Sequence, residues 1–504
     1  MSGRRVPTPK PVPSSRAISS RKVALDALLR VEDGAFAHIL LPQALRSSGL
    51  EPRDRALVTD LVYGTVRMQR SLDVLLATVS NRKITALDPP VRAALRLGAY
   101  QLLVGVPAHA AVGETVGVVD TRARGFVNGV LRNLARSGPP FALPGGDDVA
   151  SVAVRTSHPD WIVRTFFEAF GVPDAIATLE LDNEAPPVTL RVNPMRSSIE
   201  AMTAELRAAG AEVEPGALAQ GALLVRHTGD LAALPAIAEG RATPQDQASQ
   251  AVVAVLDPQP GERILDLASA PGGKATAAAE RMGGDGLVVA ADLHPGRVRT
   301  VLRAAERIGV RDAIAPVVAD GRHPAVRAGA FDRVLLDAPC SGLGVLRRRP
   351  DARWRVEPTD VRDLAALQRV LLAAAADAVR PGGRLVYAVC TLSREETLDI
   401  DEWARTELPH LVAESPPAAP WRRFGRGALL LPSDARTDGM FVLSLRRREV
   451  PSADAASPAV RAAVASSPAQ PSSEESGAAS DELGRSASQA SNPSFVTRDV
   501  ASAR

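Results

Sequence analysis

Cysteine is nearly absent from this chain, since only Cys340 and Cys390 occur among its 504 residues. Two thiols cannot build a disulfide framework or a four-thiolate zinc site, so we expect neither disulfides nor a bound metal. Long hydrophobic runs are also missing, because no segment approaches the ~18 uninterrupted apolar residues of a membrane helix. The first residues are basic, but the apolar segment of a secretory signal does not follow them. These absences favour a protein of the reducing cytoplasm with no membrane partner.

Strong net charge is absent as well, because the chain carries only +3. Residues 1–22 hold six basic side chains and no acid, whereas residues 449–504 hold seven acids and four arginines. Residues 23–448 are therefore neutral overall, and any affinity for nucleic acid must come from local patches or from the basic arm. Both ends are rich in Pro, Ser or Ala, so we expect residues 1–20 and 449–504 to be disordered.

Three sequence patterns divide the rest of the chain. Residues 21–140 place apolar residues at three- and four-residue spacings, which predicts an all-helical domain of about five to seven helices. Residues 155–245 combine helical segments with the strand-like stretches PVTLRVN and ALLVRH, which predicts a small α+β module. Residues 246–448 alternate strands, loops and helices, as in a Rossmann-like α/β domain with a parallel sheet.

A glycine-rich turn follows the first strand of the predicted α/β domain, in the stretch LDLASAPGGK. Glycines in such a turn let a ligand approach backbone N–H groups at the start of the next helix. The next three strands lead to Asp292, Asp320 and Asp337. In open α/β sheets these strand ends meet at the edge where ligands bind. The glycine-rich turn could instead be only a tight connection between a strand and a helix, with no ligand. That alternative would not explain why three neighbouring strands also lead to an aspartate.

The ligand that suits this edge is a nucleoside without a phosphate chain, such as S-adenosylmethionine. A Walker motif is excluded because no Ser or Thr directly follows Lys274. Asp292 ends the second strand, where an acid can accept hydrogen bonds from ribose hydroxyls. The candidate cofactor-binding residues are Ala268, Ser269, Ala270, Pro271, Gly272, Gly273, Lys274, Asp292, Asp320 and Asp337.

Cys340 follows one strand of the predicted sheet, and Cys390 ends the next strand. We expect Cys340 and Cys390 to lie close to each other and to Asp337, and we expect Ser393 and Glu396 to form a capping box for the next helix. Buried cysteine can act simply as a small apolar residue. Beside a methyl donor, however, a thiolate can add to carbon 6 of cytosine and make carbon 5 nucleophilic, while an acid such as Asp337 stabilises the adduct at ring nitrogen 3. The base must be unstacked for this reaction. The residues alone do not say which thiol attacks.

Arginines and an aromatic residue follow Cys340 in the stretch GVLRRRPDARWRV. Such a loop beside a catalytic site suits RNA phosphate binding and base stacking, and the alternative is a solvated charged loop. The candidate RNA-binding residues are Arg347, Arg348, Arg349 and Trp354.

Several of these stretches resemble one known family. LDLASAPGGK, LLDAPCSGLG and YAVCTLSREE resemble motifs of the RNA 5-methylcytosine methyltransferases. RDRALVTDLVYGTVR and GFVNGVLRNLAR resemble the NusB-like domain that is joined to the catalytic domain in the RsmB/Sun branch. The resemblance runs from about Arg21 to Arg448. It implies a class I methyltransferase domain, S-adenosylmethionine as cofactor, 16S ribosomal RNA as substrate, and RNA binding by both the helical domain and the small module.

The resemblance also assigns roles to single residues. It implies that Cys390 attacks carbon 6, that Cys340 assists proton removal or product release, and that Asp337 lies against the target base. It places the loop 268–274 and the three strand-end aspartates against S-adenosylmethionine. The chain departs from the usual motifs at Ala268–Ala270, where the family has Cys-Ala-Ala, and at Val389 and Thr397.

Two other interpretations stay open at this point. One is a non-catalytic RNA-binding or antitermination-type factor, which would have no need of two thiols at strand ends. The other is a methyltransferase that acts on tRNA or on a protein. We expect the chain to be a monomer.

Overall fold

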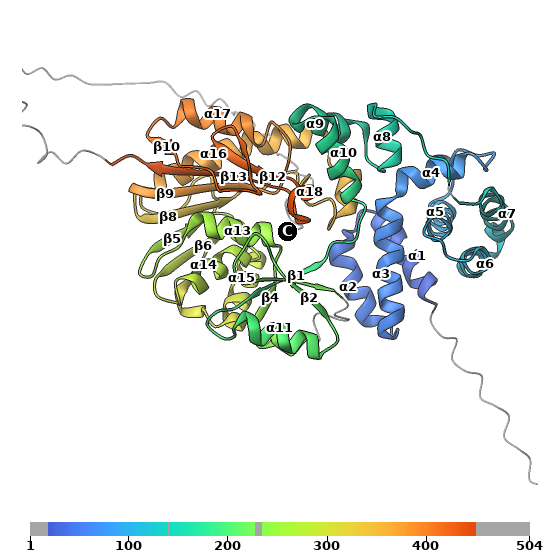
Figure 1. The fold of residues 1–504 in the computed structure, drawn as a ribbon, viewed down its shortest axis with the longest axis horizontal. Coiled ribbons are helices and arrows are strands. Elements are labelled where there is room, and N and C mark those ends of the chain that lie inside the picture. The colour runs from blue at the N-terminus through green and yellow to red at the C-terminus, as the bar shows by residue number, and fades with distance from the viewer. Residues whose placement is uncertain (1–18, 140, 227–233, 450–504) are drawn as a thin grey trace, which may run out of the picture.

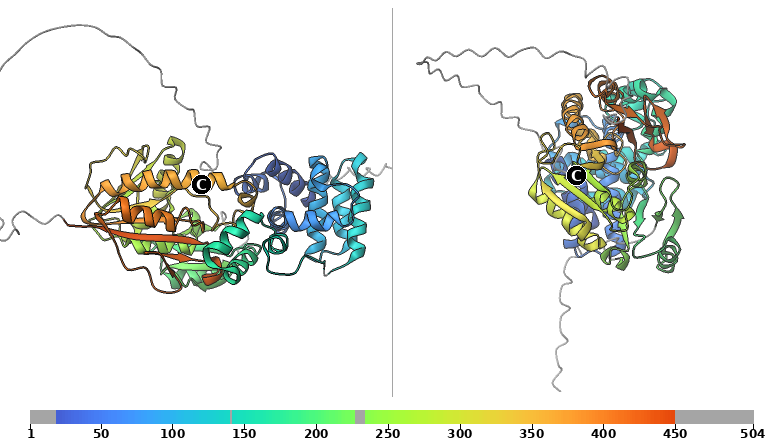
Figure 2. Two further views of the ribbon diagram at one scale, coloured as in Figure 1. Left: turned by 90° about the horizontal axis from the view of Figure 1, so that it is seen from above. Right: turned by 90° about the vertical axis from the view of Figure 1, so that its left-hand side faces the viewer.

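The structure of this chain is a computed structural model that describes residues 19–139, 141–226 and 234–449. The disorder expected for both ends of the chain concerns residues that lie almost entirely outside these ranges. Figure 1 shows an all-helical lobe on the right and a lobe built around a large sheet on the left. The left view of Figure 2 shows the lobes at opposite ends of an elongated body, and the right view looks along its long axis.

Residues 20–137 form the predicted helical domain. Its helices are α1 (Ser20–Glu32), α2 (Ala37–Ser47), α3 (Pro52–Arg67), α4 (Gln69–Ala77), α5 (Pro89–Leu103), α6 (Ala108–Val118) and α7 (Thr121–Ser137), with a short 3-10 helix η1 (Ile84–Ala86) before α5. Helix α5 is central and is buried over most of its length. Gly98 permits close packing there, because a Cβ at this position would lie 2.4 Å from a methyl carbon of Leu131 in α7.

A helical connection and a small sheet follow. The connection consists of α8 (Val149–Arg155), α9 (Asp160–Phe170) and α10 (Val172–Leu181). The small module contains β1 (Val188–Val192), α11 (Ile199–Ala208), β2 (Glu212–Pro215), β3 (Ala222–Arg226), α12 (Pro235–Ala238) and β4 (Ala242–Pro244). Its strands are antiparallel in the order β2-β3-β1-β4. The two strand-like stretches of the sequence became β1 and β3, and the predicted α+β module is confirmed.

The α/β domain is built on one large twisted sheet. Its first half contains α13 (Gln247–Leu256), β5 (Arg263–Asp266), α14 (Gly273–Arg281), β6 (Leu287–Asp292), α15 (Pro295–Ile308), η3 (Arg311–Ala313), β7 (Ile314–Val318), β8 (Phe331–Asp337) and η4 (Pro350–Trp354). Its second half contains α16 (Pro358–Ala378), β9 (Val379–Val389), α17 (Leu398–Glu407), β10 (Leu411–Ala413), β11 (Arg422–Phe424), β12 (Gly427–Leu430), α18 (Pro432–Ala435) and β13 (Met440–Arg447).

The strand order β11-β12-β13-β9-β8-β5-β6-β7 decides where a ligand can bind. Strands β5 to β9 are parallel, and the order reverses beside β5, which pairs with both β6 and β8. Helices α13, α14 and α15 enclose one apolar core and α16 and α17 another, so the sheet is covered on both faces. The carboxyl ends of β5, β6 and β8 therefore meet at a topological switch point, the usual place for a ligand in such sheets.

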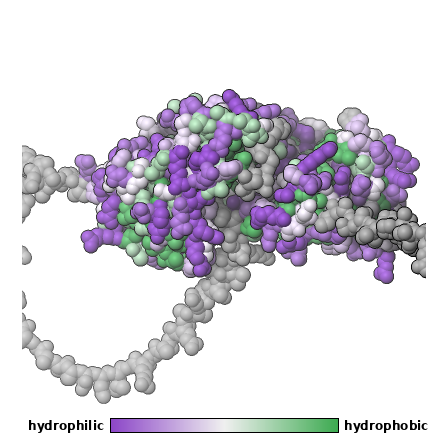
Figure 3. All heavy atoms as spheres, turned by 90° about the horizontal axis from the view of Figure 1, so that it is seen from below, coloured by the Kyte–Doolittle hydropathy of each residue, from purple (hydrophilic) through white to green (hydrophobic). Residues whose placement is uncertain are grey.

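Two surface properties bear on the environment of the chain. Hydrophilic side chains cover much of the face drawn in Figure 3, with smaller hydrophobic areas between them. Across residues 19–139, 141–226 and 234–449, no helix combines the length and the apolar character needed to cross a bilayer.

Candidate active site

The glycine-rich turn between β5 and α14 is closed against the neighbouring strand. Gly272 has φ +100°, a left-handed conformation that favours glycine, and a Cβ there would lie 3.0 Å from the Cα of Val301. The backbone N–H of Ala270 donates to the Asp292 carboxylate at 3.2 Å, and that of Ser269 donates to the Ala291 carbonyl at 2.8 Å. The turn and the tip of β6 thus form one rigid edge, with the N-terminus of α14 opening onto it.

The three strand-end aspartates have different environments. Asp292 is buried, and it also accepts from the backbone N–H of His294 at 3.2 Å. Asp337 accepts from the Lys274 ammonium at 2.7 Å, which connects the end of β8 to the first turn of α14. Asp320 lies two residues beyond the end of β7 and pairs with Arg322 at 2.6 Å; hydrogen bonding to that guanidinium holds the pKa of its carboxyl below the usual range.

Asp266, the last residue of β5, is a fourth acid at this edge that our sequence reasoning did not select. It is fully buried, and a hydrogen bond from the Ser269 side chain acts to lower its pKa. Burial, with the nearby Asp337 charge, raises the pKa of Asp266 to about 7. Asp266 could have been found from the sequence, because it ends the strand before the glycine-rich turn. The rule that selected Asp292, Asp320 and Asp337 as acids at strand ends applies equally to Asp266.

The two cysteines lie together, as their strand positions predict. The Sγ atoms of Cys340 and Cys390 are 3.4 Å apart, a separation of two thiols rather than a disulfide bond. Cys340 is buried and Cys390 is partly exposed. The backbone N–H of Gly344 donates to the Cys390 carbonyl at 3.0 Å, so the two cysteine-bearing loops also contact through the main chain.

Two further acids were missed because they are distant in sequence from the motifs. Asp438 and Asp246 both accept hydrogen bonds from Arg348, at 2.9 and 2.6 Å. Burial raises the pKa of Asp438 to about 7; Arg348 opposes the rise, while Asp246 and the nearby Cys390 add to it. Arg348 therefore neutralises a buried acidic pair close to one of the thiols.

The expected capping box after Cys390 is wrong. Helix α17 begins at Leu398 with Thr397 as its N-cap residue, and Ser393 uses its hydroxyl to donate to the Glu396 carboxylate at 2.9 Å. Glu396 turns away from the helix because it is buried among donors from the Cys340 loop as well. Local spacing could not reveal those partners, which lie more than fifty residues earlier in the chain.

The arginine-rich loop contacts the rest of the chain rather than standing open to solvent. Arg347 is 3% exposed and donates to the carbonyls of Ala185 and Arg436 at 3.0 and 3.1 Å, and the Trp354 indole donates to the Val66 carbonyl of α3 at 2.8 Å. Arg348 is occupied as described above, and Arg349 is half-buried. The donors of Arg347, Arg348 and Trp354 thus have partners inside the protein. RNA binding by the four candidate residues of this loop stays a prediction.

Arg353 of η4 is the centre of this contact between lobes. It is fully buried and donates to Asn183 Oδ1 at 2.9 Å and to the carbonyls of Ser157, Asp182 and Arg67, at 3.1, 3.2 and 3.3 Å. Burial lowers the pKa of Arg353 to about 9 and raises that of Asp182 to about 7.

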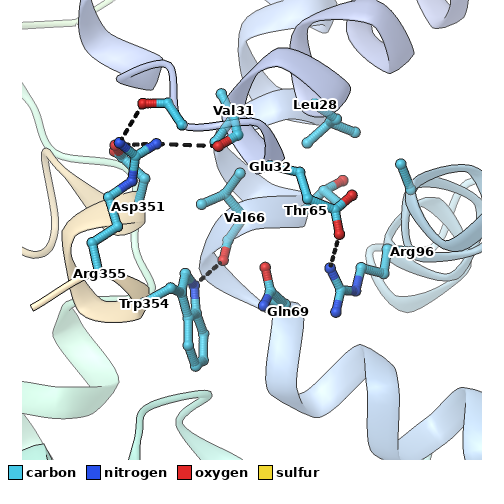
Figure 4. A pocket seen from close by; sticks show the side chains of 12 residues that line it. Leu28, Val31, Glu32, Thr65, Val66, Gln69, Arg96, Asp351, Trp354 and Arg355 are labelled. Carbon is cyan, nitrogen blue, oxygen red and sulfur yellow. Dashed lines mark hydrogen bonds and ion pairs between the residues drawn. The ribbon is translucent and has the colours of Figure 1, made fainter. Parts of the chain in front are cut away.

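A cavity of about 340 Å³ lies beside η4, between the two lobes (Figure 4). Trp354 and Arg355 extend toward α1 and α3, where Arg355 donates to the Gly34 carbonyl at 2.8 Å. The loop that carries Cys340 thus continues directly into the contact with the helical domain.

The small module is joined to the cofactor edge by one buried side chain. Arg191 of β1 is 6% exposed and donates to the Gly273 carbonyl at 2.7 Å and to Glu280 of α14 at 2.9 Å. It also donates to the Thr276 hydroxyl at 3.1 Å. The module therefore supports the first turn of the helix that follows the glycine-rich turn.

The comparisons with known proteins agree with this arrangement. Residues 253–446 match the family described as 16S rRNA methyltransferase RsmB/F, residues 18–136 match the NusB family, and residues 158–232 match the ferredoxin-like domain of RsmF/B-like methyltransferases. A Bacillus subtilis protein named "Probable ribosomal RNA small subunit methyltransferase B" is 36% identical over 450 residues, which cover 85% of this chain and 99% of that protein. The chain belongs to the family of ribosomal RNA small subunit methyltransferases B. This membership confirms the predicted family and its three kinds of domain.

Two more relatives extend the comparison. The Pseudomonas syringae "Ribosomal RNA small subunit methyltransferase B" is 36% identical over 444 residues, covering 85% of this chain and 97% of that protein. The crystal structure of the protein PH0851 superposes with a TM-score of 0.74 at 25% identity, covering 86% of this chain and 99% of that one. The predicted fold class is confirmed, and the chain is a small-subunit ribosomal RNA methyltransferase that depends on S-adenosylmethionine.

The residues at the cofactor edge fit S-adenosylmethionine. The left-handed Gly272 brings the turn to the start of α14, whose first N–H groups have no partners within the helix and can meet a ligand. Asp292 at the tip of β6 would take the ribose hydroxyls, as an acid does in this position. Asp320 and Asp337 would flank the same ligand from the next strand ends. Among the described residues, no group of three or more His, Cys, Asp or Glu side chains has the arrangement of a metal site.

Proposed function

We propose that this enzyme methylates carbon 5 of a cytosine in 16S ribosomal RNA by covalent catalysis. The observation that carries the proposal is the pair of thiols 3.4 Å apart, beside a sheet edge where Asp337 is paired with Lys274. Methylation of a nitrogen or of a ribose hydroxyl needs no thiol, because those atoms are already nucleophilic. Carbon 5 of cytosine becomes nucleophilic only when another group adds to carbon 6.

The protein's own residues would carry the covalent steps. The Cys390 thiolate forms an S–C6 bond, and the electrons of the C5–C6 double bond move to carbon 5. As the adduct forms, ring nitrogen 3 takes up a proton from solvent, and the resulting N3–H would donate to the Asp337 carboxylate, which the Lys274 ammonium also contacts. S-adenosylmethionine, when bound, supplies the methyl group to carbon 5. Cys340 then assists removal of the carbon-5 proton, the double bond forms again, and the C6–S bond breaks to release Cys390.

The partial exposure of Cys390 favours it as the attacking thiol, because an RNA base must reach it. Cys340 is more buried, at 8% exposure, and follows Asp337 closely along the same loop. The same division of roles is implied by the family resemblance of the two motifs. A pair of thiols so close together would readily oxidise, which favours a reducing cytoplasm as the location. The expected monomeric state stays a prediction.

The test is a comparison of Cys390→Ser and Cys340→Ser with RNA and S-adenosylmethionine on one denaturing gel. We expect Cys390→Ser to abolish both methylation and the covalent adduct, since a hydroxyl is too weakly acidic to supply the attacking anion. We expect Cys340→Ser to accumulate a protein–RNA adduct, because addition proceeds and release fails. An adduct with Cys390→Ser alone would reverse the two roles. Unchanged methylation in both variants would disprove covalent catalysis.

The RNA itself is identified by bisulfite sequencing of ribosomal RNA and tRNA from a strain that lacks the protein. Loss of one protected cytosine in 16S ribosomal RNA is the expected result. Loss of a protected cytosine in tRNA would instead support the tRNA enzyme, and no loss in either RNA would support a non-catalytic RNA-binding factor.

A further inference from the structure

A buried carboxylate, that of Glu396, joins the two loops that carry the cysteines. From the Cys340 loop, it accepts the backbone N–H of Ser341 at 2.9 Å and also the Ser341 hydroxyl. From the Cys390 loop, it accepts the hydroxyls of Thr391 at 3.0 Å and Ser393 at 2.9 Å. Ser341 directly follows Cys340, and Thr391 directly follows Cys390. Each thiol is therefore one residue away from a hydrogen bond to the same carboxylate.

A second buried residue supports the same arrangement. Gln368 of α16 donates from its amide nitrogen to Glu396 at 2.9 Å and to the Pro339 carbonyl, just before Cys340, at 2.8 Å. Its amide oxygen accepts from the Tyr387 hydroxyl at 2.9 Å, and that hydroxyl lies 2.8 Å from the Glu396 carbonyl. The network thus extends from the carboxylate to the strand that leads into Cys390.

The donors around Glu396 require a carboxylate. Its side chain is fully buried, and burial raises the pKa of its carboxyl, while hydrogen bonds from Ser341, Gln368 and Ser393 oppose that rise. Several donors converge on two oxygens, and only an ionised carboxylate accepts at both oxygens without presenting a donor of its own. Burying such a charge is costly unless it is fully hydrogen-bonded.

We propose that Glu396 is a positioning residue that fixes Cys340 and Cys390 relative to each other. The catalytic consequence rests on the covalent mechanism proposed above, in which one thiol must leave carbon 6 while the other helps to deprotonate carbon 5. A displacement of about 1 Å in a reacting group can reduce a rate about 100-fold. We therefore expect Glu396 to act on turnover and not on the affinity for the cofactor, which binds at the ends of β5 and β6.

The experiment compares Glu396→Gln with Glu395→Gln, a matched control that removes a charge one position away. Glutamine keeps the size of the side chain but turns an NH₂ group toward the donors, so the variant loses acceptors where both loops need them. We expect Glu396→Gln to lower kcat about 100-fold. Its KM for RNA and its affinity for S-adenosylmethionine should stay within about twofold of the parent values. Glu395→Gln should match the parent in all three quantities.

A second readout does not depend on methyl transfer. Diamide, a diazene oxidant, converts two thiols to a disulfide and is reduced to the hydrazine, taking up both protons and both electrons. In the parent the thiols are held 3.4 Å apart, so the Cys340–Cys390 disulfide should form quickly. We expect Glu396→Gln to form it at least about fivefold more slowly, because the loops are no longer held together.

The outcomes separate this inference from the proposed function. A slower disulfide in Glu396→Gln, with no covalent RNA adduct in any variant, would support positioning and refute the covalent mechanism. Parent-like disulfide formation and parent-like kcat in Glu396→Gln would overturn the inference. If Glu396→Gln failed to fold, Thr391→Val would decide, since it removes one donor without changing side-chain size. That variant should lower kcat severalfold with unchanged cofactor affinity, and a parent-like kcat would again overturn the inference.

Discussion

Replacing Arg353 with methionine should destabilise the contact between the two lobes. The guanidinium is fully buried and donates to four backbone carbonyls and to Asn183, so methionine would remove the donor from all of these acceptors. Burial lowers the pKa of Arg353 to about 9, because desolvation disfavours the charged guanidinium. Removing the guanidinium charge removes this desolvation cost, which offsets part of the stability lost with the hydrogen bonds.

The magnitude follows from these opposing effects. Each buried acceptor left unpaired costs about 1–3 kcal/mol, and removing one partner from a buried charged network typically costs about 3–5 kcal/mol in total. Burial raises the pKa of Asp182 to about 7, and the Arg353 charge opposes this rise. The substitution would remove that stabilising charge as well. We therefore expect a loss of about 3–5 kcal/mol, which for lobes of this size lowers Tm by about 6–20 °C.

Differential scanning calorimetry at pH 7 measures this change. The matched control is Arg362→Met, the same substitution on the exposed face of α16, which should change stability by less than about 0.5 kcal/mol. If Arg353→Met lowered Tm no more than Arg362→Met, the buried guanidinium would contribute nothing to the joint between the lobes. The reasoning from the five acceptors of Arg353 would then be refuted.

Two further predictions concern the cofactor edge. Asp292→Ala should weaken S-adenosylmethionine binding by about 1–3 kcal/mol, because charge-assisted hydrogen bonds to the ribose are lost, and unchanged affinity by calorimetry would refute that placement. Asp266→Asn should become more stable than the parent as pH rises from about 4 to 7. Burial raises the folded pKa of Asp266 to about 7, above its ordinary value in the unfolded chain. Between these two pKa values the unfolded carboxyl ionises while the folded one stays protonated, so the parent loses stability as pH rises, whereas asparagine does not titrate. Urea unfolding at pH 4, 6 and 8 checks this, and a stability difference independent of pH would contradict it.

The features that the sequence predicted correctly are those that depend on neighbours along the chain. Alternating strands and helices predict a parallel sheet, and the last residue of each strand must then lie at its ligand edge. This rule correctly predicted the positions of Asp292 and Asp337 at the sheet edge and the proximity of the two cysteines. The Sγ atoms of Cys340 and Cys390 are 3.4 Å apart because the consecutive strands β8 and β9 are paired. Helical spacing and proline punctuation likewise predicted the helical domain.

Tertiary structure decided how the charged side chains are used. The sequence of an arginine-rich loop does not show whether the loop faces solvent or the protein interior. Packing of η4 against α3 and the end of α10 gives Arg353 and Trp354 their hydrogen-bond acceptors. Glu396 matched a local capping box in sequence, yet the Cys340 loop supplies two of its donors. The sequence showed Arg191 only as one residue of a predicted strand, and its contact with Glu280 of α14 is visible only in the folded structure. These partners are 55 to 288 residues apart in the chain. Hydrophobic periodicity carries no information at such separations, so charge pairing across domains is visible only in the folded molecule.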